Sequence, residues 1–151
     1  VSRWCDPTKW QSPSFRKLKP AEKLIVFYIN DVCNNAGFLE FDPEDCSFRT
    51  KMTEDQVNEA YKNIQHLIDT SSTHWIYIKG FLKEQRNIPL KANVNAHLQI
   101  IRMIVDMKDI FPEVYHELVK KPGLEKDMDK KNTYKAKTFN KPSVEQNGLM
   151  Q

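Results

Sequence analysis

The sequence of 151 residues is poor in glycine and has no long apolar run. Its four glycines, Gly37, Gly80, Gly123 and Gly148, stand far apart, so the chain lacks the glycine-rich loop that cradles a phosphate. The longest apolar run, Leu24–Ile29, is well short of the roughly 20 residues that cross a bilayer. We therefore expect neither a cofactor held by such a loop nor a membrane partner.

Cysteine is also scarce. The three residues, Cys5, Cys33 and Cys46, form an odd set without a C-x-x-C pair. This spacing argues against a disulfide framework or a zinc finger and is typical of a reducing compartment, with cysteines as small buried residues. The start, Val1–Trp4, lacks the apolar core of a signal peptide. We expect an intracellular protein.

The four histidines, His66, His74, His97 and His116, show no spacing typical of metal ligands. None of them lies beside a plausible nucleophile in the sequence. We therefore predict a protein without a metal or cofactor and without enzymatic activity.

The net charge of +3 is unevenly distributed. Residues 120–151 contain eight lysines against four acids, whereas the rest of the chain is almost neutral. Residues 122–151 also contain few large apolar side chains, which predicts a basic, disordered tail. Such a tail is either an electrostatic tether to nucleic acid or a solvated linker.

The first strongly predicted helix covers Lys19–Val32. Pro20 stands in its first turn, where proline costs no hydrogen bond, and apolar residues surround most of the helix circumference. This pattern indicates a central helix.

Capping patterns predict two further helices. The first begins at Asp42, with proline behind the cap and acids in the first turn, and runs to about Arg49. The second begins at Thr53, which forms a capping box with Gln56, and runs to about Gln65.

Three short segments predict strands, namely Phe38–Phe41, His66–Asp69 and Trp75–Lys79. The last two flank the turn Thr70–Thr73 and form a hairpin. Trp75 and Tyr77 alternate with their neighbours, which favours core packing over stacking on single-stranded nucleic acid.

The order helix, strand, helix, turn, helix, hairpin predicts a mainly α, α+β fold: a winged helix-turn-helix with three helices and a small antiparallel sheet, over residues 1–90. Gly80 lets the chain leave the hairpin, and a helix from Phe81 packs back on the core. Trp4 and Trp10 should anchor the N-terminal segment. Additional helices over residues 91–121 pair as a hairpin or form a dimerisation arm.

The run WQSPSFRKLKPAEKLIVFY at Trp10–Tyr28, followed by NNAGFLEF, MTEDQVNEAYKNI and HWIYIKGFLKEQRN, resembles a known domain. It is similar to the N-terminal winged-helix domain of phage replication-initiation and replisome-organiser proteins, the DnaD-like group. The similarity covers about residues 4–100, touches NIPLKANVNAH, and consists of aromatic and apolar patterns rather than catalytic signatures.

The resemblance implies double-stranded DNA binding at a replication origin, in the cytoplasm of a bacterial host. It also implies a replication protein partner, the helicase-loading machinery, recruited through a C-terminal module that we expect to be missing or vestigial here.

A winged helix inserts the second helix of its turn into the major groove, here the exposed face of Thr53–Gln65. Asn58 and Asn63 can read adenine, but the three acids of this face are unfavourable near phosphates. Basic and polar residues around the helix complete the predicted contacts with nucleic acid, which are Arg16, Lys17, Lys19, Arg49, Lys51, Thr53, Asn58, Lys62, Ser72, His74, Lys79, Lys83 and Arg86.

Two alternatives stay open. The same helix face suits a protein-interaction or dimerisation module, in which the chain forms a homo-oligomer or binds a protein partner. A transcriptional regulator would share the DNA binding and differ in its biological role.

Overall fold

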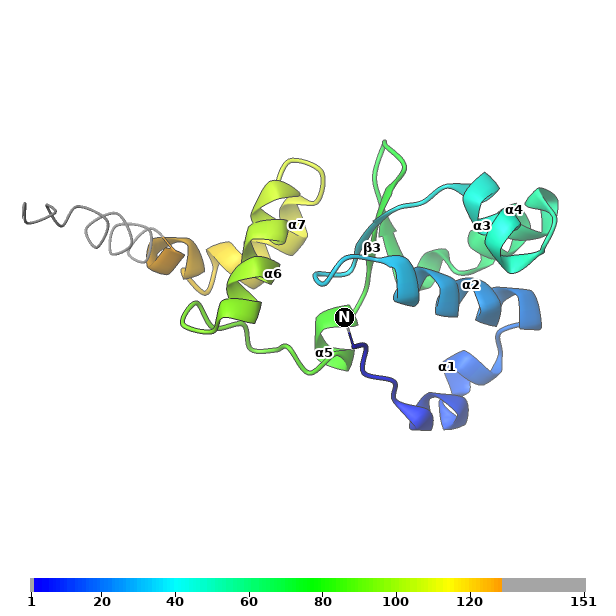
Figure 1. Cartoon of the computed structure of the whole chain (residues 1–151), viewed down its shortest axis with the longest axis horizontal. Coiled ribbons are helices and arrows are strands. Elements are labelled where there is room, and N and C mark those ends of the chain that lie inside the picture. Colours follow the sequence, from blue (N-terminus) through cyan, green and yellow to red (C-terminus); the bar gives the residue numbers. More distant parts are fainter. Residues whose placement is uncertain (1, 129–151) are drawn as a thin grey trace, which may run out of the picture.

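A computed structural model describes residues 2–128, which form mainly helices around a small antiparallel sheet (Figure 1). The sheet has the strand order β1-β3-β2, where β1 is Phe38–Glu40, β2 is Ile68–Thr70 and β3 is Trp75–Ile78. Both neighbours pair antiparallel with β3. The predicted α+β class and the presence of three strands are confirmed. The second strand is shifted from its predicted place, because His66 and Leu67 form a 3-10 turn and Thr70, predicted in the hairpin turn, ends the strand.

Three helices lie on one side of β3 in Figure 1, namely α2 (Pro20–Val32), α3 (Pro43–Thr50) and α4 (Glu54–Asn63). Both predicted caps are present. Asp42 Oδ1 accepts the N–H of Glu44 at 2.9 Å. Thr53 and Gln56 exchange the two bonds of a capping box, at 2.9 and 3.2 Å. The α4 helix ends earlier than predicted, because a 3-10 turn, η2 (Gln65–Leu67), leads into β2.

The α2 helix has one buried and one exposed side. Ile25 and Ile29 are fully buried and Glu22 is largely buried, whereas Leu24 and Val32 are exposed. The α2 helix packs against both α3 and α4, as expected of a central helix. Two of its apolar residues nevertheless face solvent, because an exposed apolar residue on a helix is common.

The second face of the sheet is covered by the C-terminal helices, α6 (Asn95–Asp106) and α7 (Pro112–Tyr115), followed by a π-helical turn, η3 (His116–Lys120). The ring of Phe111 lies 5.5 Å from that of Phe38 and 6.4 Å from that of Tyr77, between centroids. These helices pair as a hairpin that packs on the chain's own sheet. Tyr77 is a core residue, as expected.

The helical unit continues beyond residue 121, the predicted start of the tail. Residues 124–128 are helical, Leu124 is buried, and the Tyr115 hydroxyl donates to Glu125 Oε2 at 2.6 Å. The prediction of disorder is therefore corrected for residues 122–128. The rest of the predicted basic tail, 129–151, lies outside the described residues.

The N-terminal segment contains the 3-10 turn η1 (Pro7–Gln11) and the short helix α1 (Pro13–Arg16), and it packs beside α5 (Phe81–Glu84). Gln85 exchanges two hydrogen bonds with the backbone of Trp4, at 2.8 and 2.9 Å. The segment is thus anchored, but not by burial of two tryptophans, because Trp4 and Trp10 are both about half exposed. Within residues 2–128, no helix has the length and apolar character needed to span a membrane.

Candidate nucleic-acid interface

The α4 helix presents a continuous polar face. Asn58 and Lys62 are exposed on it, as predicted, together with the acids Glu54, Asp55 and Glu59. Val57, Ala60 and Ile64 are buried on the opposite side. Because the Thr53 capping box fixes the start of the helix and the core fixes its buried side, the polar face has a defined orientation.

Asn63, the second predicted reader of adenine, has another role. Its side-chain amide donates to Glu22 Oε1 at 2.9 Å, and Glu22 Oε2 accepts the N–H of Lys19 at 2.9 Å. Glu22 is buried, so these bonds satisfy a carboxylate inside the fold. The Asn63 amide thus joins α4 to the start of α2, and adenine reading by Asn63 stays a prediction. The two residues are 41 positions apart, and no local spacing indicates this pair.

The turn between α3 and α4 contains a cation above an exposed ring. Lys51 ends α3 in the left-handed conformation, with a φ of 62°, and its Nζ lies 4.7 Å from the centroid of the Phe48 ring. Phe48 is 72% exposed, which makes it the most exposed of the large hydrophobic side chains in the described residues. No pattern in the sequence marked Phe48 as a surface residue.

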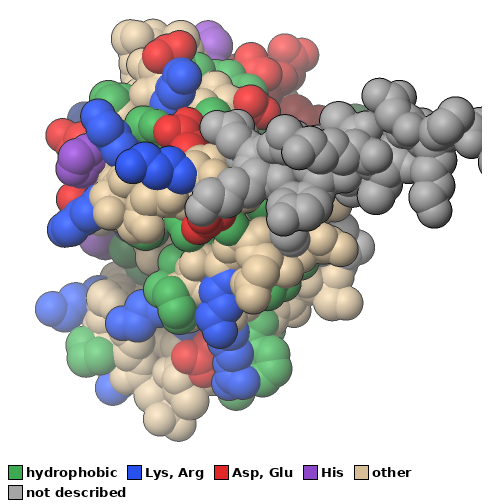
Figure 2. Space-filling view, turned by 90° about the vertical axis from the view of Figure 1, so that its left-hand side faces the viewer, with side chains coloured by type: hydrophobic (Ala, Val, Ile, Leu, Met, Phe, Trp, Pro, Cys, Tyr) green, Lys and Arg blue, Asp and Glu red, His purple; other side chains and the backbone are tan. Residues whose placement is uncertain are grey.

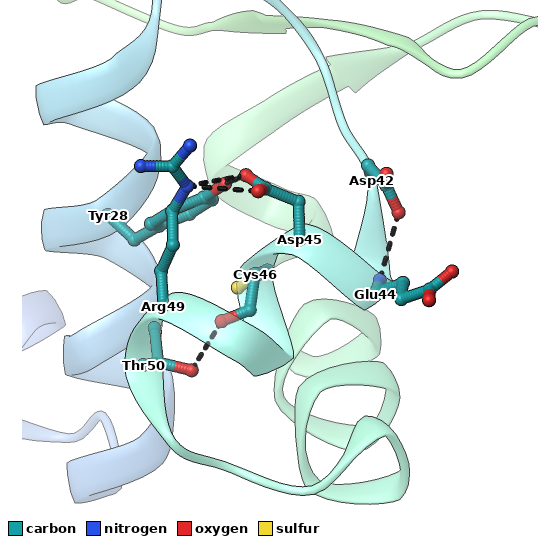
Figure 3. A network of polar contacts seen from close by, with 7 residues as sticks. All are labelled: Tyr28, Asp42, Glu44, Asp45, Cys46, Arg49 and Thr50. Carbon is teal, nitrogen blue, oxygen red and sulfur yellow. Dashed lines mark hydrogen bonds and ion pairs between the residues drawn. The ribbon is translucent and has the colours of Figure 1, made fainter.

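Arg49 is engaged in a network with Asp45 and Tyr28 (Figure 3). Its Nε donates to both Asp45 oxygens, at 2.8 and 3.0 Å, and the Tyr28 hydroxyl donates to Asp45 Oδ2 at 2.8 Å. Hydrogen bonds from Tyr28 and Arg49 hold the pKa of the Asp45 carboxyl below its usual value. Arg49 is exposed and bonds Asp45 through Nε alone, so its two terminal nitrogens point away from Asp45 and a phosphate contact does not require release of the pair (Figure 3).

The three cations of the α1–α2 junction, Arg16, Lys17 and Lys19, are all exposed. The bonds of Glu22 to Lys19 and Asn63 place this junction beside the C-terminal end of α4. These cations therefore flank the same end of α4 that carries Lys62.

The hairpin tip, with Ser72 and His74, is polar and exposed, as predicted. The N–H of Phe41 donates to the carbonyl oxygen of His74 at 2.8 Å, so the tip lies beside the start of α3. That helix start carries Asp42 and Glu44. The charged side chains at the helix start beside the tip are therefore acidic, which is unfavourable for a phosphate contact there.

The remaining predicted cations lie at the foot of the hairpin, the end opposite its tip. Lys79 forms an ion pair with Asp69 at 3.5 Å, and the guanidinium carbon of Arg86 lies 3.6 Å from the centroid of the Trp4 ring. Lys83 is exposed on α5, which Figure 1 shows at the same end as the N-terminus. The structure therefore does not bring these three residues to the α4 face.

The α6–α7 side of the molecule has a surface of mixed charge. Figure 2 views this side and shows Lys and Arg side chains interleaved with Asp and Glu. An open depression there is lined by both signs, including Lys108, Glu113 and Lys120.

A pocket that the sequence did not indicate lies where the N-terminal segment meets α2, η2 and the foot of β3. It has a volume of about 380 Å³, with Phe15, Leu18 and Ile29 among its apolar walls. Burial raises the pKa of the Glu84 carboxyl, one of its lining residues. The residues come from five separate segments, which explains why no motif marks them.

The described residues contain no group of three or more His, Cys, Asp or Glu side chains placed to hold a metal ion. His97 is used locally, since its Nδ1 accepts the N–H of Lys91 at 3.0 Å.

No match to this chain was found among protein-family models, curated proteins or solved structures. The resemblance to replisome organisers therefore rests on the sequence patterns alone.

Proposed function

We propose that residues 1–90 form a winged helix-turn-helix domain that binds double-stranded DNA, with α4 in the major groove. The observation that carries this proposal is the exposed polar face of α4, which is held rigidly against α2 and α3 and bears Asn58 and Lys62. Asn58 has the donor and acceptor needed for an adenine edge, and the acids beside it can accept from the amino group of cytosine.

Phosphate contacts come from the cations around α4. Lys51 precedes the helix, Lys62 lies near its end, and the α1–α2 junction adds Arg16, Lys17 and Lys19. The acids Glu54, Asp55 and Glu59 oppose non-specific attraction to the backbone. The domain thus binds with modest affinity for random sequence, and base contacts account for much of its preference for a particular site.

The biological role follows from the resemblance. Phage replication organisers bind duplex DNA at an origin, and we propose the same setting for this chain, as an initiator in a bacterial cytoplasm. A partner protein of the replication machinery belongs to the same proposal.

The test is fluorescence anisotropy with labelled random duplex at several salt concentrations, using the full chain and residues 1–128. We expect both to bind, with a salt slope smaller for residues 1–128, because the removed segment contains five lysines and only two acids. In residues 1–128, Lys51→Gln and Lys62→Gln should each lower the salt slope by about one. Lys108→Gln, an exposed lysine on the α6–α7 side, is the matched control.

If residues 1–128 fail to bind duplex, or if the three lysine variants behave alike, the proposal of groove binding by α4 is wrong. The second candidate then applies, a protein-interaction module. It is favoured by one observation, namely that the ring of Phe48, on α3, is 72% exposed beside Lys51, just before the start of α4. In that case Phe48→Ala should abolish self-association or partner binding, measured by sedimentation.

A further inference from the structure

An aromatic cluster with two cations lies on the surface near the start of the chain. Trp10 is 54% exposed, and its ring meets Phe15 edge to face at a centroid distance of 5.0 Å. Phe27 lies 6.1 Å from Trp10 and 5.9 Å from Phe15. Lys9 Nζ lies 4.9 Å from the Phe27 ring, and Lys23 Nζ lies 5.5 Å from both the Trp10 and the Phe15 rings.

The chain segment that carries this cluster is basic, although the carboxylates of Asp6 and Glu84 line the adjoining pocket close to Lys9. Residues 7–23 carry five cations against one acid, and that acid is the buried Glu22, whose two oxygens are already bonded within the fold. Of the side-chain ion pairs formed by the described residues, none involves these five cations. The cluster therefore combines an exposed indole with an excess of cations, of which Lys9 also lies near Asp6 and Glu84.

The pocket of about 380 Å³ opens beside the same cluster, because Lys9 and Phe15 belong to both. Its walls are mainly apolar, and Ser12, Ser14 and Asn30 add hydrogen-bonding groups. The side-chain amide of Asn30 donates to the carbonyl oxygen of Val26 at 2.7 Å. This bond fixes the Asn30 side chain and leaves its Oδ1 available as an acceptor. An apolar cavity with a few fixed polar groups is typical of a site for a flat polar ring.

We propose that Trp10 and the adjoining pocket bind single-stranded nucleic acid. One base stacks on the exposed Trp10 ring, a neighbouring base enters the pocket, and Lys9 and Lys23 contact the connecting phosphates. Aromatic side chains within a basic surface are the usual means of binding unpaired strands. A duplex keeps its bases stacked on one another, so it cannot use the ring or the pocket in this way. The Trp10 ring and the pocket use no residue of α4, although the neighbouring Arg16, Lys17 and Lys19 also belong to the proposed duplex contacts.

The experiment measures the affinity of the full chain for labelled oligo(dT), for oligo(rU) of the same length and for random duplex. The variants are Trp10→Ala, Trp10→Phe and Lys9→Gln. The matched control is Trp4→Ala, because Trp4 is exposed to a similar degree but stacks under Arg86 instead of beside the pocket. Any contribution of the basic C-terminal segment is common to all variants.

Trp10→Ala should weaken binding of single strands about tenfold, as expected for the loss of one stacked base. Trp10→Phe should restore most of it, Lys9→Gln should weaken it and lower the salt slope, and Trp4→Ala should leave it unchanged. Duplex affinity should stay the same in Trp10→Ala. Whether oligo(dT) or oligo(rU) binds more tightly tells which kind of strand the site prefers.

Tryptophan fluorescence gives a second readout if Trp10→Ala fails to fold. Saturation with oligo(dT) should quench the wild-type emission, and the part due to Trp10 should be absent in Trp10→Phe. The proposal is overturned if Trp10→Ala and Trp4→Ala bind single strands equally, if duplex affinity falls as much as single-strand affinity, or if the quench is the same in Trp10→Phe. None of these outcomes depends on the lysine variants that test α4.

Discussion

Gly37 and Gly80 both have positive φ angles, of +94° and +73°, but their surroundings differ. A Cβ at Gly37 would lie 2.9 Å from the Cβ of Phe81, a fully buried side chain, whereas a Cβ at Gly80 would meet nothing within 4 Å. At position 37, both the positive φ and the close approach of Phe81 require a glycine. At position 80, the positive φ alone favours one.

This contrast gives a prediction for two alanine variants. Gly80→Ala should cost about 1 kcal/mol, the usual cost of a left-handed conformation for a residue with a Cβ. Gly37→Ala should cost clearly more, since Phe81 or the loop must also move. Urea unfolding followed by circular dichroism measures both values. Equal losses would show that the close approach of Gly37 to Phe81 is relieved without cost.

The cysteines predict a difference in reactivity. Cys5 is exposed, whereas Cys33 and Cys46 are buried, and burial raises the pKa of both thiols to about 11. Only the thiolate reacts with disulfide reagents. At neutral pH we expect one thiol to react rapidly in the native protein and three in denaturant. Cys5→Ser should remove the rapid reaction, and its persistence in that variant would contradict the burial of the other two.

At the scale of single elements, local signals predicted most of the fold. The Asp42 and Thr53 caps lie where the sequence placed them, because a cap depends on residues only two or three positions away. The roles of Asn63 and Arg49 were not predictable in the same way. The partner of Asn63 lies on another helix, and the Asp45 that binds Arg49 is itself positioned by Tyr28 of α2. Such side chains look free until the packing of the helices is known.

The Tyr28–Asp45–Arg49 network joins α2 to α3 and should make stability depend on pH. The pKa of Asp45 is lowered in the folded protein, so its contribution is present above the unfolded pKa and is lost as pH falls through the folded pKa. Burial and the bond to Asp45 raise the pKa of Tyr28, so its contribution is present below the unfolded pKa and is lost as pH rises through the folded pKa.

Thermal unfolding of wild type and Asp45→Asn across the pH range tests this behaviour. We expect Asp45→Asn to be less stable at neutral pH and the difference to vanish in acid, once Asp45 of the wild type is protonated. Asp109→Asn, which replaces an exposed acid on the α6–α7 connection, serves as the control. A stability difference for Asp45→Asn that does not change with pH would argue against a charged Asp45 in the network.

At the scale of the whole molecule, the sheet is buried on both faces. The hairpin buries Ile76 and Ile78 as well as Tyr77, and Figure 1 shows β3 between α2–α4 on one side and α6–α7 on the other. The sequence left open whether the C-terminal helices pair as a hairpin outside the winged helix or form a dimerisation arm. They pair as a hairpin, but this hairpin packs on the chain's own sheet, because the ring of Phe111 lies against Phe38 and Tyr77.

Phe111→Ala tests this arrangement. Loss of a buried phenylalanine should cost about 3–5 kcal/mol. Since the helices and the sheet share one core, calorimetry should still show a single transition at a lower temperature. Phe48→Ala is the matched control, because the same change at a 72% exposed ring should shift stability by no more than about 0.5 kcal/mol. If Phe111→Ala instead gave two transitions, with the first removing only the C-terminal helices, these helices would form a separately folding unit, free to exchange between chains.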